Sequence, residues 1–197
     1  MKKWLPLIII VVLLIGLFRW GVGLNNTMVE KQETAKTQWA NVESAYQRRA
    51  DLIPNLVNTV KGYAGHEKET LEGVINARAN ATKTTIDPTN VTPEQMAAFQ
   101  ESQNTLSGAL SRLMVVAERY PDLKANQNFL ELQSQLEGTE NRINVERNRY
   151  NELAKDYNVY VRKFPASVVA NILNFDPLVL FEAAAGSEKA PTVDFNS

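Results

Sequence analysis

The chain has 197 residues, of which 44% are hydrophobic and 22% charged, with no cysteine and a formal net charge of −1. This composition indicates a packed domain rather than a disordered chain, and it excludes disulfides, thiolate nucleophiles and zinc–thiolate sites. Residues 1–24 carry three basic side chains and no acid, so the remainder is mildly acidic and poorly suited to nucleic acid, whose binding depends on neutralising phosphates.

The N-terminal segment predicts a membrane anchor. From residue 4 to residue 24 the only charged side chain is Arg19, and 21 residues span about 31 Å as a helix, close to the hydrocarbon thickness of a bilayer. Trp4 and Trp20 stand where interfacial aromatic residues belong. We therefore expect residues 1–24 to form a transmembrane anchor that contacts lipid through residues 4–24.

A cleaved signal peptide is the alternative to a retained anchor, because Gly21-Val22-Gly23 has the small-x-small pattern of a cleavage site. The bulky Trp20 and the charged Arg19 just before it favour retention. Lys2 and Lys3 at the N-terminal side favour a cytoplasmic N-terminus with the domain outside the cytoplasm.

The rest of the chain predicts an all-α fold of long helices with a 3.5-residue apolar repeat. The segment 81–93 carries the main break, and Thr92, Pro93 and Gln95 there have the pattern of a capping box that starts a helix. The repeat predicts an antiparallel bundle over residues 25–181. The repeat positions are Trp39, Val42, Tyr46, Arg49, Ile53, Leu56, Val60 and Tyr63, then Met96, Phe99, Gln103, Leu106, Leu110, Leu113, Ala117 and Tyr120, then Phe129, Leu132, Leu136, Thr139, Ile143, Glu146, Tyr150, Leu153, Tyr157, Tyr160 and Phe164.

Arg49 and Glu146 interrupt these repeats with charge. We predict that both face the bundle interior and pair with each other, fixing the register more than adding stability. If the register drifts by one position, both side chains are solvated instead.

The C-terminal region predicts a short apolar helix over residues 165–173, too short to cross a bilayer. Residues 165–181 fold back over one end of the bundle, or form an apolar surface for a partner or for the membrane. Residues 182–197 are polar and are expected to form a flexible tail.

The sequence carries no recognisable catalytic motif. The single histidine, His66, begins H-E-K-E-T, but Thr70 stands where a zinc-protease helix has its second histidine. Neither a phosphate-binding glycine loop nor a nucleophile elbow is present. We expect no enzymatic activity, no cofactor and no bound metal.

Several segments together resemble the signature of the LemA family. They are WANVESAYQRRADLIPNLV at 39–57, YPDLKAN at 120–126, FLELQ at 129–133, ENRI at 140–143, RNRYN at 147–151 and the pair Phe164-Pro165. The resemblance implies a bacterial single-pass protein of the cytoplasmic (inner) membrane, with an antiparallel helical bundle and no established cofactor. It suggests a membrane protease or another envelope protein as partner, and it leaves the orientation open.

These observations favour a membrane-anchored scaffold or adaptor that presents a helical surface to partner proteins. The residues expected to form the interaction patch are Arg48, Asp51, Asn55, Glu140, Arg142 and Arg147. The alternatives are a self-assembling protein that forms a homo-oligomeric ring or coat on the membrane, and a protein that organises the membrane surface through residues 165–181.

Overall fold

The computed structural model of the protein describes residues 4–182 and is helical throughout its regular elements. The helices are α1 (Leu5–Tyr63), α2 (Lys68–Lys83), α3 (Pro93–Ala117), α4 (Pro121–Lys124), α5 (Gln127–Arg162) and α6 (Ala166–Leu173). The described residues contain no strand. The predicted all-α class with an N-terminal apolar helix and an antiparallel bundle is confirmed.

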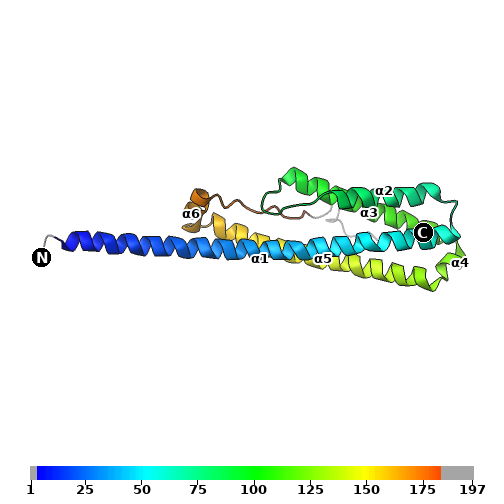
Figure 1. Cartoon of the computed structure of the whole chain (residues 1–197), viewed down its shortest axis with the longest axis horizontal. Helices are drawn as coiled ribbons and strands as arrows, with labels where there is room; N and C mark the ends of the chain where they lie inside the picture. The colour runs from blue at the N-terminus through cyan, green and yellow to red at the C-terminus, as the bar shows by residue number, and fades with distance from the viewer. Residues whose placement is uncertain (1–3, 183–197) are drawn as a thin grey trace, which may run out of the picture.

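The first helix is one uninterrupted rod of 59 residues. Every side chain from Leu7 to Trp20 is exposed. Among residues 4–182, α1 is the one helix that is long and apolar enough to cross a membrane, and this segment lies within its apolar part. The helix then enters the bundle without a break at residues 24 and 25, and it continues through Pro54. Figure 1 shows the N-terminal part of α1 projecting alone beyond the bundle.

Helix α5 runs antiparallel to α1 along most of the bundle (Figure 1). Lys31 Nζ lies 2.5 Å from the Asp156 carboxylate at one end of this pair. Farther along, Arg49 lies 2.7 Å from Glu140. Helices α2 and α3 form a second hairpin that packs on the half of the bundle far from the N-terminus.

The predicted start of α3 is confirmed. The Gln95 backbone N–H donates to the Thr92 hydroxyl at 3.2 Å, and the Thr92 N–H donates to the Gln95 side chain at 2.9 Å. This reciprocal pair satisfies two backbone donors that a helix start leaves open, with Pro93 in the first turn.

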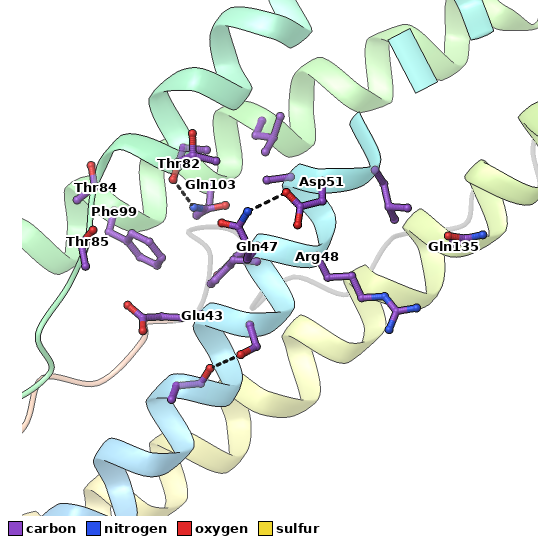
Figure 2. A pocket seen from close by; sticks show the side chains of 17 residues that line it. Glu43, Gln47, Arg48, Asp51, Thr82, Thr84, Thr85, Phe99, Gln103 and Gln135 are labelled. Carbon is purple, nitrogen blue, oxygen red and sulfur yellow. Dashed lines mark hydrogen bonds between the residues drawn. The ribbon is translucent and has the colours of Figure 1, made fainter. Parts of the chain in front are cut away.

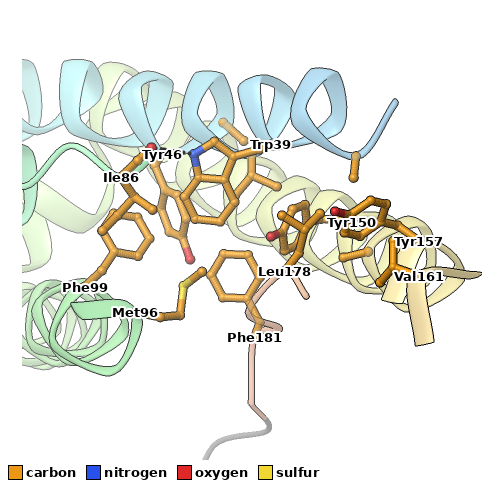
Figure 3. Packing of buried hydrophobic residues seen from close by; sticks show 14 of the residues in the cluster. Trp39, Tyr46, Ile86, Met96, Phe99, Tyr150, Tyr157, Val161, Leu178 and Phe181 are labelled. Carbon is orange, nitrogen blue, oxygen red and sulfur yellow. Dashed lines mark hydrogen bonds between the residues drawn. The ribbon is translucent and has the colours of Figure 1, made fainter. Parts of the chain in front are cut away.

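Two hydrophobic clusters fill the bundle. The one nearer the N-terminal segment is aromatic: the Trp39 ring stacks on Phe181 at 5.2 Å and meets Tyr150 edge-on at 5.1 Å (Figure 3). The far cluster is mainly aliphatic and includes Ile53 and Leu113. Aromatic pairs in these geometries add stability beyond the area that they bury.

The C-terminal segment returns along the bundle after α6. Asn174 ends α6 in the left-handed conformation, with φ of 56°, and the Phe175 N–H donates to the Ala170 carbonyl. Residues 175–182, which we call the strap, form an extended segment without regular secondary structure that runs back beside α5 (Figure 1). Leu178 and Phe181 of the strap are buried in the aromatic cluster. The predicted tail lies outside the described residues beyond Glu182.

Candidate functional site

The bundle carries adjoining clefts along α1, whose linings mix polar and apolar side chains. The first, of about 860 Å³, lies between α1, the end of α2, the loop that follows it and α3. Figure 2 shows Glu43, Gln47 and Asp51 of α1 on one side of it and threonines on the other. The Gln47 amide donates to Asp51 at 2.7 Å. Amides, hydroxyls and carboxylates of this kind offer hydrogen bonds to a docked polar surface.

Arg48 connects this cleft to a second one, of about 530 Å³, between α1 and α5. Arg142 lines the second cleft together with small residues of both helices. A third cleft, of about 430 Å³, continues along the same two helices and is lined by Asn55. Gln135 lines all three clefts, so they meet at one point on α5.

A layer of polar side chains separates the two hydrophobic clusters beneath these clefts. The Arg49 guanidinium, 2% exposed, donates to Glu140 at 2.7 Å, to Ser107 at 2.8 Å and to the Gln103 side chain at 2.6 Å. Its Nε is buried without a partner among the described residues. Because this layer joins α1, α3 and α5, it fixes how the three helices align lengthwise.

The predicted pair between Arg49 and Glu146 requires correction. Both side chains are buried, but Glu146 accepts from Gln38 at 2.5 Å and lies 2.5 Å from the Arg142 guanidinium, one turn earlier on its own helix. In the antiparallel register Glu140 lies beside Arg49, and Glu146 is almost two turns farther along α5. The apolar repeat identified the two inward-facing positions, but it did not show which residues of α1 and α5 lie opposite each other.

The structure divides the six predicted patch residues between two faces. Arg48, Asp51 and Arg142 are exposed and line the first two clefts, and Asn55 lines the third. Glu140 and Arg147 serve internal contacts instead. Glu140 pairs with Arg49 and lines a separate groove between α3 and α5.

Arg147 holds the strap. Its guanidinium carbon lies 4.6 Å from the centroid of the Phe181 ring, and the group donates to the Glu182 carbonyl at 3.3 Å and to Gln100 at 3.4 Å. A cation over an aromatic face is favourable, so Arg147 stabilises the end of the strap.

The main contacts of the strap come from four residues of α5 that were not predicted to bind it. The Asn158 side chain pairs with both the N–H and the C=O of Leu178, at 2.7 and 2.8 Å, and Asn151 pairs in the same way with Phe181, at 2.9 Å for both bonds. The hydroxyls of Tyr157 and Tyr150 donate to the carbonyls of Asp176 and Val179, at 3.1 and 3.0 Å.

The spacing of these contacts has a simple geometric origin. Seven residues of α5 separate the two asparagines, a rise of about 10.5 Å in a helix, and three strap residues separate Leu178 from Phe181, about 10 Å in an extended chain. The Tyr-Asn pair at 150–151 recurs at 157–158. This recurring Tyr-Asn pair is the sequence pattern that could have indicated the strap contacts. It does not stand out because asparagines on a helix usually belong to the solvated surface.

Burial changes the acidity of the tyrosines that bind the strap. It raises the pKa of Tyr157 to about 12, with a further contribution from the Asp176 carboxylate, and it raises the pKa of Tyr150 well above its ordinary value. Burial also raises the pKa of Tyr46. The phenols of Tyr150 and Tyr157 therefore stay protonated, and remain hydrogen-bond donors, at pH values above the ordinary tyrosine pKa of 10.0.

Comparison with known proteins agrees with the motifs. The chain is similar to Protein LemA of Metamycoplasma hominis, with 26% identity over 178 residues that cover 90% of this chain and 78% of the relative. The family model described as LemA family matches residues 38–195, which include the bundle from Gln38 onward and the strap. The chain therefore belongs to the LemA family.

Proposed function

We propose that the protein is a non-enzymatic, membrane-anchored helical scaffold that presents the clefts around Arg48 to a partner protein of the bacterial cell envelope. One observation carries the proposal. The helix that is apolar enough to cross a membrane is the same helix that bears Arg48, Asp51 and Asn55. A partner that binds this surface is held at a fixed orientation to the bilayer, without a flexible linker between the anchor and the docking surface.

The chemistry of the clefts favours a protein partner. Their lining combines charged, amide and hydroxyl groups with small side chains such as Ala45 and Gly138, over which another chain can approach closely. The two arginines Arg48 and Arg142 in one cleft favour a partner with an acidic surface. A membrane protease or another envelope protein remains the expected kind of partner.

The test is photo-crosslinking in the native membrane. A photoreactive side chain at Arg48 is expected to give a discrete crosslinked product. The variant Arg142→Gln should weaken that product, because it removes a positive charge from the same cleft while its amide can still donate to the buried Glu146. A matched probe at Val115, 70% exposed on α3, serves as the control. Equal crosslinking from both positions would refute the docking surface. A product with twice the mass of the chain would instead favour the homo-oligomeric ring or coat.

The orientation is tested separately. The Lys2 and Lys3 bias favours a bundle outside the cytoplasm. Because the chain has no cysteine, a single Val115→Cys variant can be exposed to a membrane-impermeant thiol reagent in intact spheroplasts. Labelling before lysis supports the outside location, and labelling only after lysis contradicts it.

A further inference from the structure

Four exposed apolar side chains lie in and just before α6, at the end of the bundle nearest the anchor. Phe164, in the turn before α6, is 84% exposed, and Ile172 of α6 is 72% exposed. Val168, between them at one-turn spacing, and the neighbouring Leu173 are about half exposed. Such a cluster costs free energy in water, and clusters of this kind usually mark an interaction surface.

The register of α1 and α5 places this surface beside the end of the apolar segment. Lys31 pairs with Asp156, and Gln38 contacts Glu146. Continuing that antiparallel register puts Arg162, the last residue of α5, level with residues 22–25. An α-helix that begins at Trp4 covers the hydrocarbon thickness of about 30 Å by roughly the same residues. Figure 1 shows α6 beside α1 at this end of the bundle.

The fold holds the apolar side chains outward. The opposite side of α6 packs through the small residues Ala166 and Ala170 into the cluster that contains Met28. The strap then fixes the end of α6, because Tyr157 binds the Asp176 carbonyl and Asn158 binds Leu178. These contacts prevent α6 from turning its exposed face into the bundle.

The charges beside this surface match a phospholipid headgroup layer. Arg162 and Lys163 are exposed immediately before Phe164. Arg19 stands near the end of the apolar segment on α1, on the same side of the bilayer. Basic side chains next to apolar ones are the pattern of helices that lie in the interface of a membrane.

We propose that Phe164 and α6 form a second membrane contact, with Phe164, Val168, Ile172 and Leu173 inserted at the boundary between headgroups and acyl chains. Four side chains are too few for a standard protein–protein interface of about 1,600 Å². They suffice for lipid, because the anchor already holds them at the surface and their insertion adds no cost of association. The span and α6 together then fix the tilt of the bundle.

The experiment uses the full-length protein in nanodiscs of mixed zwitterionic and anionic phospholipid. A nitroxide on Ile172→Cys is expected to collide with oxygen, which concentrates in lipid, and to be shielded from a water-soluble nickel chelate. A nitroxide on Val115→Cys, at a comparably exposed apolar site far along the bundle, is expected to show the reverse. Equal accessibility of the two sites would overturn the proposal.

Two further measurements keep the result specific. In the first, the nitroxide is on Phe164→Cys, and Val168→Asp and Ile172→Asp are added. Both substitutions lie on the exposed face, so the bundle still folds. They are expected to raise the collisions of the nitroxide with the nickel chelate several-fold. Strong dipolar broadening between Ile172 labels, lost on dilution with unlabelled protein, would identify a second copy of the chain as the occupant and refute lipid. Neither measurement depends on crosslinking at Arg48.

Discussion

Asn151 and Asn158 hold the strap by pairing with backbone groups of Phe181 and Leu178 that would otherwise lack partners on α5. Replacing either asparagine by alanine leaves a half-buried N–H and C=O unpaired, which costs about 1–3 kcal/mol. We expect hydrogen exchange at the Phe181 amide to accelerate sharply in Asn151→Ala. The matched variant Asn148→Ala, exposed on the same helix, should leave that amide protected. Equal exchange in both variants would contradict the role of the pair.

Arg49 depends on Glu140 for its counter-charge. Glu140→Ala is expected to destabilise the bundle by about 2 kcal/mol, less than the 3–5 kcal/mol typical of a fully buried pair, because the Glu140 side chain is 46% exposed. Chemical denaturation measures the effect, with the exposed Glu137→Ala on the same helix as control.

The double variant Arg49→Met, Glu140→Gln tests the reason for that loss. It removes both charges, so it should be more stable than Glu140→Ala alone, because no unpaired cation stays buried. If the double variant is the less stable of the two, the polar layer contributes through its hydrogen bonds to Gln103 and Ser107 rather than through charge compensation.

Among the elements, α3 depends on the capping box at its start. Thr92→Ala removes the hydroxyl that accepts from Gln95 and is expected to cost about 1 kcal/mol of stability. Thr105→Ala, exposed within the same helix, should be neutral or slightly stabilising because alanine is the better helix former. Thermal unfolding of the two variants gives the comparison, and an equal loss would exclude the cap as the cause.

The strap should detach at alkaline pH. The pKa of Tyr157 is about 12 in the folded protein, against an ordinary value of 10.0, and that of Tyr150 is raised further. Above pH 10 a detached strap exposes phenols that lose protons while the bound form retains them, so binding weakens as the pH rises towards 12. Below pH 10 this contribution is fully present.

Tyrosinate absorbance during an alkaline titration measures this effect. Wild-type protein is expected to show tyrosines that ionise late, and Asn158→Ala should shift that late phase to lower pH. Tyr63→Phe, which removes an exposed phenol at the far end of α1, should leave the late phase unchanged. A late phase that is insensitive to Asn158→Ala would assign it to tyrosines outside the strap whose pKa is also raised, such as Tyr46, by burial, and Tyr120, by its hydrogen bond to Glu67.

The helices could largely be predicted from the sequence, but several contacts could not. The apolar repeat identified the buried faces from Trp39 to Val60 because a period near 3.5 is a local property of the chain. It failed at Phe164, which fits the repeat but lies beyond the last turn of α5 and is exposed. It also did not show that α1 continues between residues 24 and 39, where the buried positions Met28 and Ala35 are sparse among charged residues.

The candidate site was predictable only in part, for a related reason. A periodic pattern shows which face of a helix is buried, but not which residues of two distant segments lie opposite each other. The pairing of Arg49 with Glu140, and of Asn158 with Leu178, depends on that alignment. Arg48, Asp51 and Arg142 line adjoining clefts, whereas Glu140 and Arg147 contact Arg49 and the strap. Nothing in the spacing separated the first three from Glu140 and Arg147. Whether the patch binds a partner stays a prediction.

For the molecule as a whole, the continuity of α1 predicts a rigid junction between anchor and bundle. Nitroxides at Val12 and Ala40, both exposed, are separated by 28 residues, or about 42 Å along a continuous helix. Pulsed dipolar measurements in nanodiscs should give a narrow distribution near that value. Replacing Asn25 and Asn26 by glycine and proline should broaden it, while alanine at both positions should not. A broad wild-type distribution would mean that the junction bends.

The length of α1 also sets how far the proposed docking surface lies from the apolar segment. By the rise of an α-helix, Arg48 stands about 36 Å beyond residue 24, and the turn after Tyr63 stands about 58 Å beyond it. A membrane protein with only short loops outside the bilayer is too low to touch Arg48. If the bundle docks a protein at the clefts as proposed, we expect that partner to project several nanometres from the lipid.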